Sequence, residues 1–466
     1  MPWAGNQEPW RGASISLQQG TLHVLGGNVG RKISRVVLVG HFGTQNYGND
    51  ATLASMVGWL TTLAPIQLLA MVHGPAAVGS LMDVPTISLY ADREKLAWLP
   101  DLVRGAIGKL VDEIRMVWLL HSEDVVVVPG SGVFEETLSG PFWGLGLSLL
   151  TVALAARIKG ARLAFVGIGA AYQRKALVRW MTRRTLSGVG FLTLRDEQSR
   201  DALTRAGVAA GSARVFPDIV MSQQVGPGVV APQVRVPPLR IGLGVLSYFD
   251  REAPEAGAEV ARRYELTMAE FAGWLVGEGH EVVLLTGDGG DEAAAWRVRV
   301  LAAQFLAPGL AERISFPSPR DFRDVMRQVE RLDVVIAARF HNLVFAMLAG
   351  RPVISVGYSA KCSSLLSAAG LGAYATRLQS VELNDLKERF GRLAADLPAV
   401  AEDVASFRDR AALESERHRE ELVGFITSSP ASDRHHEIPN SGGWVPTSRR
   451  TPAPRPRRYI RRDVAA

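Results

Sequence analysis

The chain has 466 residues, 47 % of them hydrophobic, which predicts two domains of about 200 residues, each with its own core. Its single cysteine, Cys362, excludes a disulfide framework and a cysteine-based zinc site, and such sparse use of cysteine is typical of a cytoplasmic protein. We expect no signal peptide, because the N-terminus lacks a basic start followed by an apolar run.

The formal net charge of +6 is concentrated near the C-terminus, where seven arginines lie between positions 449 and 462. Residues 429–466 are therefore predicted to be a disordered Arg/Pro-rich tail. Such a tail either contacts anionic head groups at the inner face of a membrane or stays solvated without a partner. The rest of the chain is close to neutral, so we expect no nucleic-acid partner.

The first half of the chain alternates between predicted strands and helices. After a partly disordered leader over 1–32, a domain over 33–222 begins with the strand 35–39, the turn 40–50 and the helix 51–64. An uncharged stretch over 138–156 is at the edge of membrane-spanning length, and we interpret it as a buried domain helix. The further strands are expected at 66–72, 85–89, 124–128, 162–167 and 190–194, with helices at 92–119, 142–158, 173–187 and 196–206.

The same alternation restarts after a Pro/Gly-rich linker over 223–238. A second domain over 239–378 has predicted strands at 240–245, 281–285, 312–315, 333–337 and 354–356, with helices at 256–279, 291–305, 320–329 and 341–349. One charged C-terminal helix over 379–428 follows and is expected to return to the first domain. The sequence thus predicts an α/β protein of two Rossmann-like, doubly wound domains that face a cleft, a GT-B-like arrangement.

The turn at 40–50 contains three glycines directly after a strand and before a helix. Backbone N–H groups in such a turn can approach an anion or a sugar, so Asn46, Gly48 and Asp50 are candidate substrate-binding residues. The glycine spacing fits neither the dinucleotide-binding pattern nor a Walker A loop. The alternative for Asp50 is a structural helix cap.

The strand at 124–128 ends in Pro-Gly-Ser-Gly, which makes Gly130 and Gly132 further candidates for substrate binding. Glycines at a strand end indicate that something approaches the backbone closely. That neighbour is either a ligand or the next helix, and the pattern leaves both open.

Residues 338–361 contain the most informative segment, which reads as strand end, turn, helix, second strand and basic loop. Arg339 and His341 follow one strand, and Lys361 follows the next. Ligands of open α/β sheets bind beyond the carboxyl ends of the strands, so these side chains should converge. Arg195 ends an earlier strand and either faces the same crevice or forms a surface pair with Asp196.

These motifs together resemble the polysaccharide pyruvyl transferase family over about residues 34–375. The resemblance rests on Gly-Thr-Gln-Asn-Tyr-Gly-Asn-Asp-Ala-Thr-Leu from position 43, Asp-Val-Val-Val-Val-Pro-Gly-Ser-Gly from 124, Leu-Arg-Asp-Glu-Gln-Ser from 194, Phe-Pro-Asp from 216 and Ala-Arg-Phe-His-Asn-Leu-Val-Phe-Ala-Met-Leu-Ala-Gly-Arg-Pro-Val-Ile from 338. The chain departs from the family pattern at Asn49, where an acid is usual, and at Pro129 and Ser131, which interrupt a usual run of glycines.

The resemblance implies a GT-B-like fold and the transfer of pyruvate from phosphoenolpyruvate to two hydroxyls of a sugar, which forms a cyclic ketal in exopolysaccharide or cell-surface glycan synthesis. It implies that Arg195, His341 and Lys361 are catalytic and that the acceptor is a sugar or a lipid-linked oligosaccharide. Arg339 would assist in binding the donor. Neither a cofactor nor a metal is expected. Two other functions remain open, a GT-B glycosyltransferase that uses a nucleotide sugar and a non-catalytic glycan-assembly protein.

Overall fold

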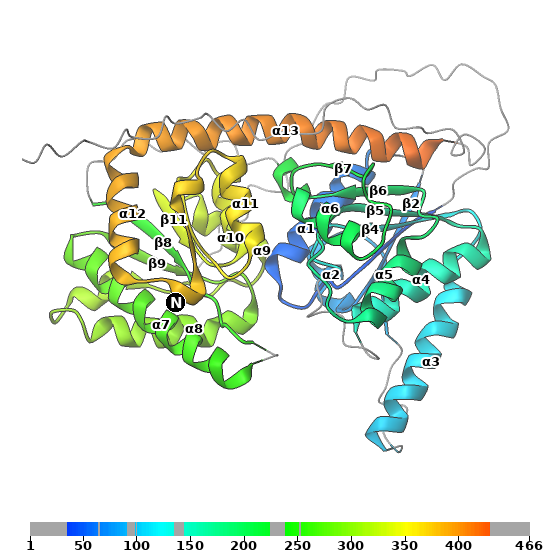
Figure 1. The fold of residues 1–466 in the computed structure, drawn as a ribbon, viewed down its shortest axis with the longest axis horizontal. Helices are drawn as coiled ribbons and strands as arrows, with labels where there is room; N and C mark the ends of the chain where they lie inside the picture. Colours follow the sequence, from blue (N-terminus) through cyan, green and yellow to red (C-terminus); the bar gives the residue numbers. More distant parts are fainter. Residues whose placement is uncertain are drawn as a thin grey trace, which may run out of the picture.

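The structure is a computed structural model, and it describes residues 35–63, 66–90, 98, 100–134, 144–223, 238–250 and 253–428. The predicted leader over 1–32, nearly all of the predicted linker and the predicted tail over 429–466 lie outside the described residues. Figure 1 shows two α/β halves side by side, with one long helix lying across both.

The first half is built on a seven-stranded parallel sheet with the order β3-β2-β1-β4-β5-β6-β7. Its central strand is a run of four valines, buried on both faces as β-branched residues of a parallel sheet usually are. The strands are β1 (Arg35–Gly40), β2 (Gln67–Val72), β3 (Thr86–Ser88), β4 (Asp124–Pro129), β5 (Arg162–Ile168), β6 (Phe191–Leu194) and β7 (Arg214–Val215). The helices are α1 (Tyr47–Leu60), α2 (Pro75–Leu81), α3 (Asp101–Leu119), α4 (Leu145–Lys159), α5 (Ala176–Leu186) and α6 (Glu197–Arg205), followed by the 3-10 helix η4 (Ile219–Ser222).

The second half repeats this topology with a six-stranded parallel sheet in the order β10-β9-β8-β11-β12-β13. Both sheets therefore reverse their strand order once, between β1 and β4 and between β8 and β11, as in a Rossmann fold. The strands are β8 (Arg240–Gly244), β9 (Glu281–Leu285), β10 (Ile314–Ser315), β11 (Val334–Ala337), β12 (Val353–Gly357) and β13 (Ala375–Arg377). The helices are α7 (Pro254–Gly277), α8 (Glu292–Ala303), α9 (Phe322–Val329), α10 (Phe340–Leu348) and α11 (Ala360–Ala368).

Two predictions about the C-terminal part of the chain are wrong in detail. The segment after β12, which reads as a basic loop in the sequence, begins a helix at Ala360, so Lys361 lies in the first turn of α11. The predicted C-terminal helix is in fact two helices, α12 (Leu383–Ala395) and α13 (Leu397–Thr427). The chain breaks at Asp396 because Pro398 has no backbone N–H to continue the hydrogen bonds of α12, whereas proline is tolerated in the first turn of a new helix such as α13.

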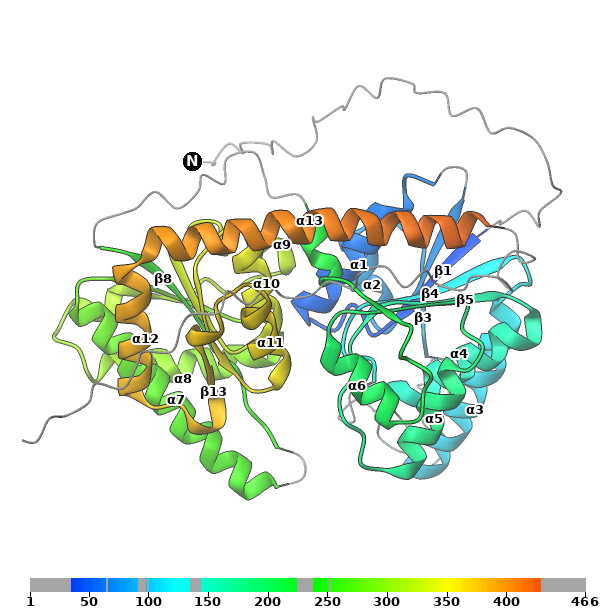
Figure 2. The ribbon, with the colours of Figure 1, turned by 45° about the horizontal axis from the view of Figure 1, so that its top comes forward.

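Helix α13 ties the second half back onto the first, as Figure 2 shows from a second direction. Near its C-terminal end, His418 is fully buried, its ring stacks on Phe216 with centroids 4.2 Å apart, and its Nε2 lies 2.8 Å from Thr193 Oγ1 in β6. One hydrophobic cluster runs from α1 through η4 into the second half, so the two sheets are joined by a continuous core. In the part of the chain that the structure describes, no helix has both the length and the apolar composition needed to cross a bilayer.

Candidate functional site

The candidate site lies where the carboxyl ends of both sheets face each other. His341 is the second residue of α10 and directly follows β11. Arg195 follows β6 in the first half, and Lys361 follows β12 in the second. The sequence predicts these three residues from separate motifs, and the structure places them together around the ring of Phe340.

His341 lies against the start of α1. A Cβ built on Gly48 would lie only 1.8 Å from His341 Nδ1, so only glycine allows this approach. On the other side of the ring, Nε2 lies 3.8 Å from Oδ2 of Asp218, a residue that also caps η4. Nε2 is buried and has no hydrogen-bond partner among the described residues, so its capacity to form one is unused.

The protonation state of His341 follows from this environment. Burial lowers its pKa from 6.5 to about 4, because the charged imidazolium loses its hydration. The Asp218 carboxylate opposes this shift, whereas the positive charges of Arg195, Lys361 and Arg339 add to it. The imidazole is therefore neutral at pH 7 in the unliganded protein and can accept a proton.

Arg195 and Lys361 approach the Phe340 ring from the two halves of the molecule. The Arg195 guanidinium carbon lies 4.9 Å and Lys361 Nζ 6.0 Å from the ring centroid, within the range of cation–π contacts. The Arg195–Asp196 pair exists, at 3.3 Å between Nε and Oδ2, but the Arg195 side chain is only 4 % exposed. Arg195 is therefore buried, and its pair with Asp196 is not the exposed surface pair that the sequence allows as an alternative.

Arg195 and Lys361 both line a cavity of about 420 Å³ between α6 and the start of α11. Arg205 adds a third basic side chain, and Asp196 and Asp201 are the acidic residues of the lining. The N-cap of α11 is Ser359, whose buried hydroxyl has no hydrogen-bond partner within the described part of the chain. A helix N-terminus, an unpaired hydroxyl and basic side chains together form a cavity suited to a small anion.

Arg339 lies elsewhere. Its Nε and Nη2 donate to both carboxylate oxygens of Asp291, at 2.8 and 2.7 Å, and Asp291 is fully buried. Asp291 also accepts from the backbone of Ser247 and, more weakly, of Gly287. The structure thus places Arg339 in a bidentate ion pair that holds the loop after β9.

That loop is joined in turn to the predicted turn at 40–50. Asn46 caps α1 by accepting from the backbone N–H of Asn49, and its Nδ2 donates to Asp288 Oδ2 at 3.1 Å. Asp50 is 4 % exposed and accepts from the backbone N–H of Gly43 at 2.7 Å. Burial raises the pKa of Asp50 to about 6, and the nearby Asp288 carboxylate adds to the shift. Asn46 therefore joins the two halves, Asp50 holds the turn through Gly43, and Gly48 is the residue of the turn that touches His341.

The glycine-rich end of β4 forms a tight turn. Gly130 has φ +47° and packs on Thr52, where an added Cβ would lie 2.3 Å from the methyl carbon. Ser131 has φ 57°, a left-handed conformation that is rare for a residue with a side chain. Gly132 follows in the same turn. The close neighbour of Gly130 is therefore α1, an earlier helix, and not the next helix that the sequence offers as the alternative to a ligand.

Three ring side chains gather at the carboxyl ends of β1, β2 and β3. The rings of His41 and His73 lie 4.7 Å apart, and that of Tyr90 lies 5.2 Å from His73. Burial lowers the pKa of both histidines. Asn49 in α1, next to Gly48, donates to the His41 carbonyl at 3.4 Å, so this ring cluster lies beside the start of α1.

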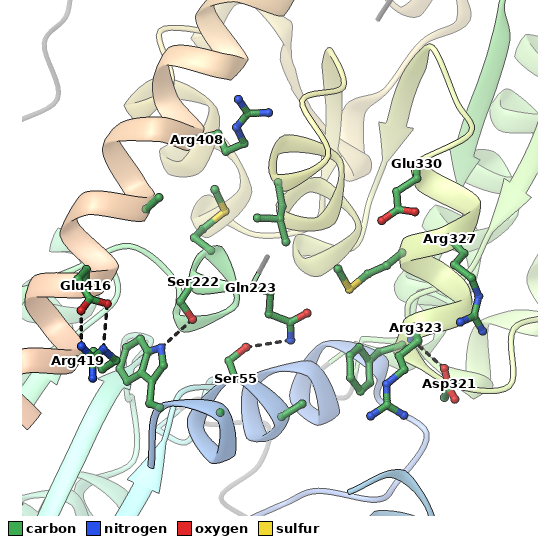
Figure 3. A pocket seen from close by; sticks show the side chains of 18 of the residues that line it. Ser55, Ser222, Gln223, Asp321, Arg323, Arg327, Glu330, Arg408, Glu416 and Arg419 are labelled. Atoms are coloured by element: carbon green, nitrogen blue, oxygen red, sulfur yellow. Dashed lines mark hydrogen bonds and ion pairs between the residues drawn. The ribbon is translucent and has the colours of Figure 1, made fainter. Parts of the chain in front are cut away.

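A second, larger cavity of about 1300 Å³ lies between α1, η4, α9 and α13. Figure 3 shows its polar side chains, among them Ser55 and Gln223, which bond each other, and Glu416 and Arg419, which form an ion pair. None of the candidate site residues from the sequence lines this cavity.

Sequence reasoning alone gives Asp218 little weight and misses Phe340 and Ser359. Phe340 could have been found as the aromatic residue between Arg339 and His341, because a ring there meets whatever the cations bind. Ser359 could not, since its capping position depends on α11, whose apolar residues show little helical periodicity.

Known proteins share the sequence pattern and the fold of this chain. A sequence model of the family described as polysaccharide pyruvyl transferase matches residues 46–360, more than half of the chain and all of the residues placed around Phe340 except Lys361. No curated protein sequence matches significantly.

Several solved structures share the fold at low sequence identity. MnaA of S. aureus in complex with UDP superposes with a TM-score of 0.54 at 12 % identity, over 85 % of this chain and 99 % of that one. UDP-GlcNAc 2-epimerase of Neisseria meningitidis bound to UDP-GlcNAc gives 0.53 at 13 % identity, over 84 % and 100 %. Sucrose-phosphate synthase of Thermosynechococcus elongatus gives 0.51 at 15 % identity, over 84 % and 98 %. These likenesses show a GT-B-like fold, and together with the matched sequence pattern they show that the chain belongs to the polysaccharide pyruvyl transferase family.

Proposed function

We propose that this protein transfers pyruvate from phosphoenolpyruvate to two hydroxyls of a sugar in a surface or extracellular polysaccharide, forming a cyclic ketal and releasing phosphate. The observation that carries the proposal is the position of Arg195 and Lys361, which come from opposite halves and flank Phe340 beside a buried, neutral His341. Two cations next to an uncharged base fit a dense anion that must exchange protons.

The donor is proposed to occupy the cavity of about 420 Å³. The Arg195 guanidinium is suited to hold a carboxylate as a fork, and Lys361 to hold the phosphate as a point charge. Ser359 Oγ and the N-terminus of α11 add donors to the phosphate. Phosphoenolpyruvate is the donor substrate in this scheme, and the scheme uses no cofactor.

His341 is proposed to manage the protons of the reaction. In the first addition, the oxygen of one sugar hydroxyl bonds to the central carbon of phosphoenolpyruvate. The hydroxyl loses its proton, and the methylene carbon gains a proton and becomes a methyl group. In the second step, the other hydroxyl bonds to the same carbon, phosphate leaves, and the second hydroxyl proton leaves with it. General acid–base assistance of this kind is typically worth about 10²–10⁴-fold in rate.

Binding of the donor would change the basicity of His341. The positive charges of Arg195 and Lys361 at the unliganded site, and of Arg339 beyond it, lower the His341 pKa. A bound phosphate and carboxylate would compensate those charges, so the pKa should rise towards its ordinary value. Asp218 would stabilise the imidazolium that forms when the ring accepts a proton.

The acceptor sugar is proposed to enter over the ring cluster of His41, His73 and Tyr90. These side chains lie at the strand ends of the first half, beside the N-terminus of α1, which also contacts His341. Rings with polar edges can pack against a sugar face and bond its hydroxyls. A lipid-linked oligosaccharide fits this role as well as a free sugar, and the reaction would take place on the cytoplasmic side, where phosphoenolpyruvate is made.

A second candidate is transfer from a nucleotide sugar. The observation that favours it is that two structures sharing this fold hold UDP or UDP-GlcNAc. It requires a nucleotide to bind between the halves, whereas the proposed reaction requires phosphoenolpyruvate.

The reaction itself is tested by incubating the protein with phosphoenolpyruvate and a panel of bacterial glycans and following phosphate release and acceptor mass. We expect phosphate release that depends on the glycan, with an acceptor mass gain of one pyruvate less one water. Glycan-dependent transfer of sugar from UDP-GlcNAc or UDP-glucose, with no phosphate released from phosphoenolpyruvate, would overturn the proposal.

A further inference from the structure

Helix α3 carries its apolar side outward. Its exposed residues include Leu110, Ile114 and Trp118, which are 60 %, 52 % and 76 % exposed, and Val103, Ile107 and Val111 lie on the same side. These positions recur at helical spacing and form one stripe along the helix. Figure 1 shows α3 projecting from the body of the first half, so the stripe borders open solvent.

The side of α3 that faces the protein is the more polar one. Lys109 is 6 % exposed and donates to Ser148 Oγ in α4 at 2.6 Å, and Asp112 is 3 % exposed. A helix that packed only for the stability of a water-soluble domain would have these sides exchanged. The outward apolar stripe therefore indicates a surface that binds a partner.

The neighbouring helices of the same layer continue the apolar surface. Helix α4 packs on α3 and exposes Leu154 and Ile158, and α5 packs on α4 and exposes Leu177 and Trp180. Figure 2 shows the three helices as one layer over the first sheet. We call the exposed apolar residues of α3, α4 and α5 the outer surface of the first half.

The charged residues of α4 and α5 have one sign. Residues 144–195 contain nine lysines and arginines and no aspartate or glutamate. Arg157 in α4 and Arg183 and Arg184 in α5 are exposed beside the apolar side chains. On α3, which has both signs, Asp112 is buried and Glu113 lies 3.4 Å from Lys109.

We infer that the outer surface of the first half binds an anionic lipid membrane. Surfaces that bind at a membrane interface combine apolar side chains, tryptophans among them, with neighbouring basic residues and few acidic ones. The apolar side chains insert between the acyl chains, and the basic residues contact the anionic head groups. A second copy of the chain fits less well, because a two-fold contact would bring the basic residues of α4 and α5 against themselves. The inference concerns a different surface from the Arg/Pro-rich tail and does not depend on the proposed reaction.

Flotation of the full chain with vesicles tests this surface. Vesicles of phosphatidylglycerol with phosphatidylcholine are compared with vesicles of phosphatidylcholine alone, at low and high salt. The double variant Leu110→Glu, Ile114→Glu interrupts the apolar stripe, and Arg183→Glu, Arg184→Glu reverses exposed charge. The matched control is Val300→Glu with Leu413→Glu, residues that are 61 % and 67 % exposed on α8 and α13. Because the tail is present in every variant, it cannot account for a difference between them.

We expect the wild type and the control to float with the anionic vesicles and not with vesicles of phosphatidylcholine alone. A smaller fraction of each protein should float at high salt. The apolar double variant should remain unbound, and partitioning of the arginine variant should fall by roughly thirtyfold or more, as two lost basic contacts imply. Unchanged melting temperatures would show that the variants are folded. Equal flotation of all variants, or none of the wild type, would overturn the inference. So would a stable dimer in sedimentation analysis that the α3 substitutions dissociate, because a second copy would then cover the surface.

Discussion

Gly48 and His341 are in direct contact across the two halves of the protein, because a Cβ on Gly48 would lie 1.8 Å from the imidazole Nδ1. The contact fixes where the ring lies with respect to Arg195 and Lys361. It also allows the site to be tested by adding a single methyl group at Gly48.

The substitution Gly48→Ala should displace the His341 ring and reduce kcat by at least about tenfold, on the scale of a lost acid–base group. The folded state should persist, since alanine favours a helix over glycine by roughly 0.5–1 kcal/mol. The control is Gly58→Ala in the same helix, where an added Cβ meets nothing within 4 Å. Steady-state kinetics of both variants check this prediction, and equal activity of the two would contradict the placement of His341.

Arg195→Lys should raise the KM for phosphoenolpyruvate by about 10–100-fold, because it removes a charge-assisted contact worth roughly 1.5–3 kcal/mol. Lysine keeps the charge but cannot form a fork. Arg200→Lys, five positions further along on the surface of α6 and paired with Glu197, serves as the control and should leave KM unchanged. An unaltered KM in Arg195→Lys would remove Arg195 from donor binding.

Asp218→Asn should lower kcat and move the acid limb of the pH profile of kcat to lower pH. The sign follows from the charge, since the Asp218 carboxylate raises the His341 pKa and its removal lets that pKa fall further. The amide oxygen can still accept from the backbone N–H of Val220, as Oδ1 does at 3.0 Å, so η4 should keep its cap. The pH profile of kcat separates this role from a structural one, because a loss of stability alone would lower activity without moving the limb.

Acid should destabilise the fold through His418. Burial lowers the pKa of His418 to about 3, so the unfolded chain binds a proton between that pH and 6.5 that the folded chain does not. The free energy of unfolding should therefore fall with decreasing pH through this window, by at most about 1.4 kcal/mol per pH unit for this group.

The difference in unfolding free energy between the wild type and His418→Gln, measured in urea at pH 7 and pH 5, isolates this effect. We expect the advantage of the wild type to shrink at pH 5. A difference that does not depend on pH would show that His418 takes up a proton as readily in the folded state as in the unfolded chain. The contribution of Asp50, which has the opposite sign, is common to both proteins and cancels.

The alternation of strands and helices, and the residues that follow each strand, could be predicted from the sequence because parallel sheets place those residues at one edge. The same rule predicts that Arg339, His341 and Lys361 converge, and this is right for His341 and Lys361, which meet around Phe340, but wrong for Arg339, which pairs with Asp291. The sequence leaves two positions open for Arg195, and the structure places it beside Phe340. The rule could not give the partner of Arg339, because the Asp291 carboxylate comes from a different strand end 48 positions away. Nor could it distinguish a ligand from a helix as the neighbour of Gly130, since both require a residue without a Cβ.

The orientation of α3 could not be predicted from the sequence, for a different reason. The sequence predicts a helix there, and its apolar residues have helical spacing, but amphipathic patterning alone implies that the apolar side is the buried one. Only the packing of Lys109 and Asp112 against the protein reveals the reversed orientation.

The most direct test of the central claim is the melting temperature of the wild type and of Lys361→Ala with phosphoenolpyruvate, inorganic phosphate or UDP. A donor at 100 times its dissociation constant should add roughly 2.7 kcal/mol to the free energy of unfolding. We predict that phosphoenolpyruvate stabilises the wild type more than phosphate does, that UDP has no effect, and that Lys361→Ala loses the stabilisation. Stabilisation by UDP and not by phosphoenolpyruvate would contradict the proposed reaction.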